Sequence, residues 1–242
     1  MASRYSSRKG SKFRFSSLRR ALRWGSLLLL LLILIDVGYL VGIWPQWESY
    51  RKGPIQRSSF IHDYHSERQN HPDWPKLRWN PVSIEDIPQA MIRAVIAAED
   101  SRFYEHDGVD LEAFKEAMQY NLSEKRMVYG ASTISQQTVK NIFLTPSRNP
   151  LRKWHELWLT IGMERNLSKK RILEHYLNVA EFGRGIYGVD AAARYYWGIP
   201  VYRLTSRQAI ELAATLPSPV KNNPRTATQS FRKRVRKIRR YF

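Results

Sequence analysis

Residues 88–100 read PQAMIRAVIAAED. Four alanines lie among the larger aliphatic side chains of this stretch, so it is expected to form an apolar helix that is buried on most sides. Such a helix needs other helices packed around it. The flanking sequence carries helix signals, whereas convincing strand alternation is absent. We therefore predict a mostly α-helical fold with one globular domain.

Further helices follow the apolar one along the chain. Capping residues and breakers mark their ends, including a capping box at Thr205-x-x-Gln208. The predicted segments are 110–122, 132–143, 150–166, 168–182, 190–197 and 205–216. Residues 45–82 contain five prolines and little helical periodicity, which favours a juxtamembrane linker.

The charge lies mainly at the two ends of the chain. The net charge is +19, and residues 1–23 and 225–242 each hold eight Lys or Arg and no acid. Residues 24–224 are therefore close to neutral, which argues against a nucleic-acid-binding domain and fits ends that lie on anionic membranes. The absence of cysteine excludes disulfides, thiolate nucleophiles and cysteine zinc sites.

Residues 24–44 are long and apolar enough for one transmembrane helix. They include nine consecutive Leu or Ile residues, 27–35, and Trp24 and Trp44 bracket the span. The alternative is a cleaved signal peptide, but the segment lacks the pair of small residues that cleavage needs. With a basic arm at residues 1–23, the positive-inside rule predicts a cytoplasmic N-terminus and an exported remainder.

Two acids, Glu99 and Asp100, end the apolar helix. A carboxylate there can be partly desolvated, which raises its pKa and suits it to general acid or base catalysis. The alternative is an ordinary helix end with a solvated turn.

A second candidate segment runs from Gly130 to Asn141. A glycine-led turn feeds a helix that begins with Ser and Thr, and such helix ends bind anions. One face of this helix is polar and suits a sugar or a phosphate; it carries Thr133, Gln137, Lys140 and Asn141.

A third segment holds Arg152, Lys153 and Glu156. The spacing of Arg152 and Glu156 is that of a surface ion pair on a helix, which is one interpretation. The other joins Lys140 to Arg152 and Lys153 as a clamp for a diphosphate, oriented by Glu156.

Together these segments resemble the signature motifs of the family 51 glycosyltransferases, the peptidoglycan polymerases. The first motif is E-D-x-x-F-x-x-H-x-G, the second G-x-S-T-I-x-Q-Q-x-x-K-N and the third R-K-x-x-E. Further motifs begin at Arg171 and at Leu216. The likeness covers residues 83–224, and the chain leaves no room for a transpeptidase domain, so it resembles the monofunctional members.

The resemblance implies a lysozyme-like fold of two helical lobes behind one N-terminal transmembrane helix. It implies polymerisation of lipid II into β-1,4-linked glycan with release of undecaprenyl diphosphate, at the inner membrane of a bacterium and on its periplasmic side. The partners would be lipid II, the undecaprenyl-diphosphate-linked glycan and the membrane, with no nucleic acid. Other cell-wall synthesis or division proteins are left open.

The resemblance also implies residue roles. Glu99 matches the general base of an inverting reaction, and Glu156 matches a second essential glutamate that orients cations or holds a divalent metal (Mg or Mn). No cofactor is obligatory. The diphosphate-binding cations are Lys140, Arg152 and Lys153. The contacts to phosphate and sugar are Ser132, Thr133, Gln137 and Asn141. The supporting residues are Asp100, Phe103 and His106.

The basic segment 225–242 alternates cations with apolar residues. Positions 231, 235, 238 and 242 share one helical face, as in a helix that lies in a membrane interface. A solvated, disordered tail is the alternative.

Two rival functions remain at this stage. A lytic transglycosylase would also use a glutamate at a helix end, but it would not need three cations for a diphosphate. A non-catalytic envelope scaffold would not need Glu99.

Overall fold

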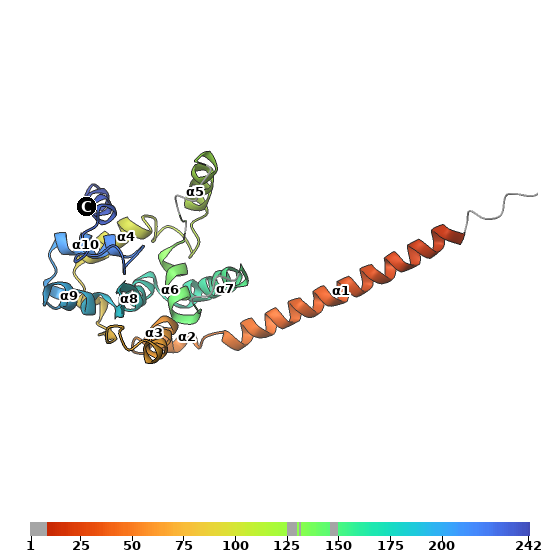
Figure 1. Cartoon of the computed structure of the whole chain (residues 1–242), viewed down its shortest axis with the longest axis horizontal. Coiled ribbons are helices and arrows are strands. Elements are labelled where there is room, and N and C mark those ends of the chain that lie inside the picture. The colour runs from red at the N-terminus through yellow and green to blue at the C-terminus, as the bar shows by residue number, and fades with distance from the viewer. Residues whose placement is uncertain (1–8, 125–129, 131, 146–149) are drawn as a thin grey trace, which may run out of the picture. The chain divides into compact units, whose positions relative to one another are not determined.

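The computed structural model describes residues 9–124, 130, 132–145 and 150–242, with side chains from Leu18 onward. The chain divides into two compact units, residues 1–45 and 46–242. Residues 1–8 of the predicted basic arm lie outside the described residues, as do 125–129, 131 and 146–149. The predicted mostly α-helical fold is confirmed (Figure 1).

The first unit is the helix α1, Lys9–Ile43. It is long and apolar enough to cross a membrane by length and composition, and its most apolar window has a mean hydropathy of 2.5. The described part of that window buries no residue, which leaves the leucine-rich surface available to lipid.

The second unit contains the remaining elements, most of them helices. Its helices are α2 Trp47–Lys52, α3 Ser59–Asn70, α4 Gln89–Glu99, α5 Leu111–Ser123, α6 Ile134–Phe143, α7 Pro150–Asn166, α8 Lys169–Val179, α9 Val189–Trp197, α10 Ser206–Thr215 and α11 Gln229–Arg239. Its short 3-10 turns are η1 Ile84–Asp86 and η2 Val201–Arg203. Its strands are β1 Arg78–Trp79, β2 Glu181–Gly183 and β3 Ile186–Tyr187.

Two helix groups form the core of this unit. In the first, α4 packs against α10, and α11 packs on both (Figure 1). In the second, α6 lies against α7 and α8. The alanines of α4 allow close packing, and Met91, Ala94 and Val95 are fully buried, as the apolar pattern predicts. The site residues lie at the ends of these buried helices.

The described residues also form a small sheet that the sequence did not reveal. Strand β3 lies between β1, which is parallel to it, and β2, which is antiparallel. Strands of two or three residues are too short to show a period in sequence. Because β2 begins at Glu181, helix α8 ends at Val179 rather than at the predicted residue 182.

The prediction of a linker at residues 45–82 does not describe what the structure shows there. This segment contains α2, α3 and β1, and Ile61 and Tyr64 are buried in a cluster with Tyr187. The backbone carbonyl of Tyr50 accepts hydrogen bonds from Arg171 (2.7 Å) and pairs with His175 (2.8 Å), which ties α2 to α8. Partners more than a hundred residues away therefore order a stretch that lacks local periodicity.

The prediction of a membrane-facing apolar side for residues 231–242 is also wrong at two of its four positions, 231 and 238. Residues 229–239 are helical, but Phe231 and Ile238 are buried at 5% and 3% exposure, in a helix that packs on α4 and α10. The hydrophobic face was correctly placed on one side of the helix. Its partner is the protein body, because α4 and α10 leave an apolar surface that this face covers.

Truncating Ile61 tests whether α3 belongs to the folded body. We expect Ile61→Ala to lower the free energy of unfolding by roughly 2–5 kcal/mol, because a fully buried side chain would leave a cavity. The measurement is denaturant unfolding of the detergent-solubilised chain. The control is His65→Ala on the exposed side of α3, and equal stability of the two variants would contradict the assignment.

Candidate active site

Glu99 is the last residue of α4, and its side chain is 11% exposed. Its Oε2 accepts a hydrogen bond from Gln137 Nε2 at 3.0 Å, and its Oε1 accepts one from Arg234 Nη2 at 2.5 Å. Burial raises the pKa of Glu99, while Arg234, Gln137 and Lys140 oppose that rise. The desolvated carboxylate that the sequence suggested is thus present, held from two sides.

The amide of Gln137 is itself oriented by a hydrogen bond from α8. Its Oε1 accepts a hydrogen bond from the hydroxyl of Tyr176 on α8, at 3.2 Å. This contact turns the amide so that its NH₂ group points to Glu99. The sequence assigned Gln137 to phosphate and sugar, whereas the structure engages it with the carboxylate.

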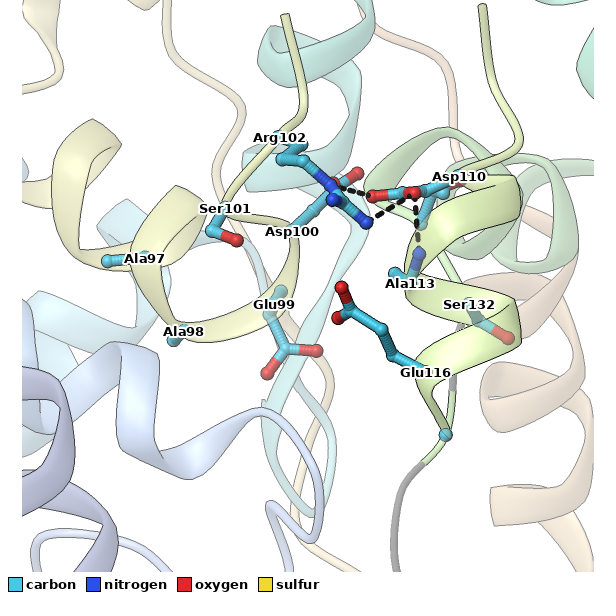
Figure 2. A pocket seen from close by; sticks show the side chains of 12 residues that line it. Ala97, Ala98, Glu99, Asp100, Ser101, Arg102, Asp110, Ala113, Glu116 and Ser132 are labelled. Carbon is cyan, nitrogen blue, oxygen red and sulfur yellow. Dashed lines mark hydrogen bonds and ion pairs between the residues drawn. The ribbon is translucent and has the colours of Figure 1, made fainter. Parts of the chain in front are cut away.

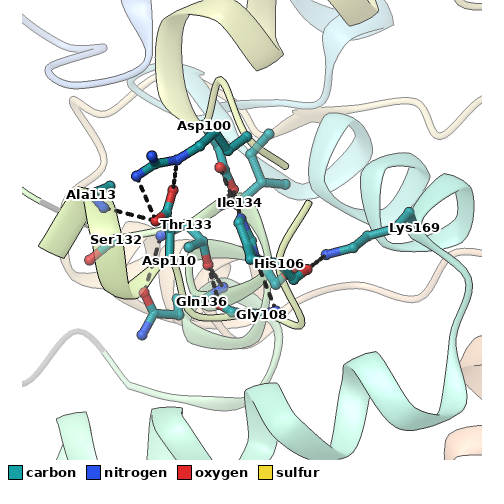
Figure 3. Close-up of polar contacts among 12 residues, drawn as sticks. Asp100, His106, Gly108, Asp110, Ala113, Ser132, Thr133, Ile134, Gln136 and Lys169 are labelled. Atoms are coloured by element: carbon teal, nitrogen blue, oxygen red, sulfur yellow. Dashed lines mark hydrogen bonds and ion pairs between the residues drawn. The ribbon is translucent and has the colours of Figure 1, made fainter. Parts of the chain in front are cut away.

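Asp100, Phe103 and His106 form a support directly after Glu99 in the chain. Figure 3 shows the contacts of Asp100 and His106. Asp100 caps α4 and accepts a hydrogen bond from the backbone N–H of Ile134 at 2.9 Å. His106 Nε2 lies 3.0 Å from the other oxygen of Asp100, and Phe103 is fully buried. The first turn of α6 is therefore fastened to the end of α4, which brings the first two sequence motifs together.

Thr133 and Gly108 add a second link between these motifs. Thr133 caps α6, is 2% exposed and donates its hydroxyl to the carbonyl of Gly108 at 2.6 Å. Gly108 has φ +94°, and a Cβ there would lie 2.7 Å from Thr160 Cγ2. Thr133 is thus a buried cap in this structure, and Asn141 is also buried. Ser132, by contrast, is exposed.

The predicted cations lie together around Glu156. Burial lowers the pKa of Lys140. The positive charges of Arg152 and Lys153 lower that pKa further, whereas the negative charges of Glu156 and Glu99 raise it. The Nζ of Lys153 forms a hydrogen bond with Glu156, whose residue is 3% exposed. The same Nζ lies 3.3 Å from Ser132 Oγ. The surface ion pair between Arg152 and Glu156 that the spacing allowed is not formed among the described residues, since Lys153 takes that place.

A pocket opens beside Glu99, and it joins α4, α5 and the start of α6 (Figure 2). The carboxyl groups of Glu99 and Glu116 both face it in the view of Figure 2. Arg102 and Asp110 form its upper wall through two hydrogen bonds of 2.8 Å. The cavity is therefore lined by charged groups, which suits a polar ligand.

Ligand atoms of Asp100, His106 and Asp110 lie within 4.8 Å of one another. Their acceptor atoms already have partners: Asp110 binds Arg102 and the N–H of Ala113, and Asp100 binds Ile134 and His106. The cluster is explained by these contacts as a bracket between helices, and we assign no metal to it.

Sequence reasoning missed three contributors to the site. Arg234 was assigned to the membrane with its basic segment, and neither Tyr176 nor Glu116 was assigned a role in the site. Each lies on an element of its own and reaches the site only through the fold. No spacing rule could have linked Arg234 to a glutamate 135 positions earlier.

Comparison with known proteins shows strong similarity. A family model described as "Transglycosylase" matches residues 69–241, a range longer at both ends than 83–224. Relatives named "Biosynthetic peptidoglycan transglycosylase" include those of Aeromonas hydrophila (48% identity over 159 residues; 66% of this chain and 67% of the relative) and Mannheimia succiniciproducens (52% over 145; 60% and 59%). That of Haemophilus influenzae is 49% identical over 145 residues, again 60% and 59% of the two chains. The aligned stretch thus spans about three fifths to two thirds of these relatives.

The Arg102–Asp110 pair makes the stability of the site depend on pH. Burial raises the pKa of Asp110, but the bonds from Arg102 and Ala113 outweigh it, so the net pKa lies below its usual 3.8. A lowered carboxyl pKa stabilises the fold above the unfolded-state pKa, and that contribution is lost as the pH falls through the folded-state pKa.

We therefore expect Asp110→Asn to reduce the free energy of unfolding by about 1 kcal/mol near neutral pH, because Asn can still cap α5 but cannot pair with Arg102. The difference from wild type should shrink as the pH falls below about 4. Thermal melts at several pH values measure it. A difference that is constant with pH would show that the ion pair is not its source.

Proposed function

The chain belongs to the transglycosylase family, and on this premise we propose that it polymerises lipid II into β-1,4-linked glycan strands. The observation that carries the proposal is the joint electrostatic environment of Lys140. This half-buried cation interacts electrostatically with Glu99 and also with Glu156, Arg152 and Lys153. A carboxylate base and a group of cations therefore share one site, as transfer from a diphosphate donor requires.

In the proposed reaction Glu99 takes the proton of the acceptor 4-hydroxyl. The hydroxyl oxygen attacks the anomeric carbon of the donor, and the bond to the lipid diphosphate breaks on the opposite face. An α-linked donor thus gives a β linkage. Lys140, Arg152 and Lys153 neutralise the charge that develops on the departing diphosphate.

Glu156 keeps these cations in place in the proposed site. Its buried carboxylate bonds Lys153 and interacts with Lys140, which limits the mutual repulsion of the cations. The resemblance also left open a divalent cation on Glu156. That single carboxylate is already paired with Lys153, which does not fit a metal ligand at this position. The proposed reaction includes no metal step.

A lytic enzyme is the second candidate, since it too would use a buried glutamate. The gathered cations disfavour it, because cleavage of a glycan releases no diphosphate. The relatives cited above carry "biosynthetic" in their names, which points the same way.

Membrane association fits the proposed substrate. Helix α1 can span a bilayer by length and composition, and a lipid-linked donor stays at the membrane surface. We propose a cytoplasmic N-terminus and a periplasmic catalytic unit in the bacterial inner membrane, because the basic residues precede the apolar span.

The general-base role of Glu99 is tested with labelled lipid II in detergent, without a nucleotide sugar. We expect Glu99→Gln to reduce polymerisation by roughly 10²–10⁴-fold at every pH, because the amide cannot accept the proton. The matched control, Glu105→Gln, changes an exposed glutamate six residues away and should leave the rate unchanged.

Three results would argue against this assignment in different ways. Lysozyme-sensitive polymer from Glu99→Gln at the wild-type rate would place the base elsewhere. Cleavage of pre-made glycan without any polymer would support the lytic candidate. No activity on either substrate by wild type would favour a scaffold.

The diphosphate clamp is tested by Lys153→Ala. We expect KM for lipid II to rise about tenfold, because one of the cations that bind the diphosphate is lost. Lys221→Ala, an exposed lysine distant in sequence, serves as control. Steady-state kinetics of both variants measure the effect, and an unchanged kcat/KM for Lys153→Ala would remove this residue from the clamp.

A further inference from the structure

We propose that Arg234, in the C-terminal helix α11, is a positioning residue that holds the carboxylate of Glu99 for its work as a base. The inference rests on the proposed function and adds α11 to the catalytic unit. The sequence had assigned this basic segment to the membrane surface.

One nitrogen of Arg234 donates two hydrogen bonds to the end of α4. Nη2 donates to Glu99 Oε1 at 2.5 Å and to the backbone carbonyl of Ala98 at 3.1 Å. The first contact fixes the side chain and the second fixes the last turn of the helix that carries it. Since Gln137 holds the other carboxylate oxygen, the orientation of the group is determined from both sides.

The helix that carries Arg234 is itself anchored on the body. Phe231 and Ile238 are buried three residues before and four residues after Arg234, so they lie on the same side of the helix. Thr228 caps α11 by accepting a hydrogen bond from Phe231 N at 3.1 Å. These anchors hold the backbone of α11 in place. Pairing Arg234 with Glu99 therefore costs less conformational entropy than it would in a mobile segment.

Other charged or titratable groups surround Glu99 as well. Lys140 on α6 is the second cation, Tyr176 lies behind Gln137, and Asp100 follows Glu99 in the chain. Across the pocket stand Glu116 and Arg102, the latter paired with Asp110. The charged residues of α10 pair with each other, Arg207 with Glu211, and Arg93 of α4 lies over the ring of Phe242.

Among these groups Arg234 makes the closest compensating contact. Burial of Glu99 favours its protonated form, which cannot act as a base, and the charge of Arg234 is the largest of the effects that oppose burial. Loss of the guanidinium should therefore raise the pKa of Glu99. The loss of activity on acidification should then begin at a higher pH.

The experiment measures kcat and KM for lipid II polymerisation against pH in the full chain. For Arg234→Met we expect the acidic limb to move up by about one pH unit, so that the rate falls about tenfold on that limb and recovers toward wild type at high pH. Arg234→Lys keeps a cation and should move the limb less. Arg236→Met, an exposed arginine on the same helix, should follow wild type.

Two kinetic outcomes would overturn the inference. A rate that drops equally at all pH values would mean that Arg234 supports the fold only. A raised KM with an unmoved acidic limb would mean that it binds substrate. If Arg234→Met does not fold, the acidic limb of the pH profile of Arg234→Lys tests the inference. An unshifted limb together with a wild-type rate would show that activity does not depend on the guanidinium.

A second readout does not depend on activity. The melting temperature of Arg234→Met should fall further below wild type at about pH 8 than at about pH 5, because ionised Glu99 is then buried without its closest cation. The pH dependence of this difference should disappear when both proteins also carry Glu99→Gln. If wild type makes no polymer, the proposed function fails, but the melting temperatures still test the contact between Arg234 and Glu99. If the difference in melting temperature does not depend on pH, the contact is overturned and the proposed function is not.

Discussion

Removing the carboxylate of Glu99 from water carries a large desolvation cost, and the contacts around the site offset it. Burial raises the pKa of this group and so favours its protonated form, which cannot act as a base. The molecule meets the cost with one cation from α11, one amide from α6 and the more distant charge of Lys140. The amide is in turn oriented by Tyr176, so four helices contribute to the state of one carboxyl group.

The same logic extends to the neighbouring cations. Lys140 is half-buried near Arg152 and Lys153, which lowers its pKa, and the two glutamates near it act in the opposite direction. Negative and positive groups therefore depend on one another across the site. In the proposed reaction, the diphosphate of the donor would supply negative charge to this group of cations.

Packing of α11 explains why a strongly basic tail belongs to the folded body. Its apolar residues cover α4 and α10, and this fixes the helix so that Arg234 meets Glu99. The remaining cations of α11 stay exposed, where they can attract anionic lipid. One face of the amphipathic helix α11 packs on the body and places Arg234 at Glu99, while its opposite face presents exposed cations.

Local patterns were sufficient for most of the helices between residues 110 and 216 and for the motif residues. The capping box at Thr205 and the predicted ends of α7 agree with the structure because they depend on neighbours within a few positions. The same patterns failed for residues 45–82, whose order comes from Tyr187, Arg171 and His175 far along the chain.

The sequence by itself determined the helical class, the apolar span, the motifs and their resemblance to the polymerases, since residue type and spacing carry these directly. Only the tertiary structure decided that Gln137 donates to Glu99 and that Arg234 completes the site. The physical reason is that such contacts join side chains from separate helices. Their partners are set by packing and by the balance of buried charge, which no local spacing records.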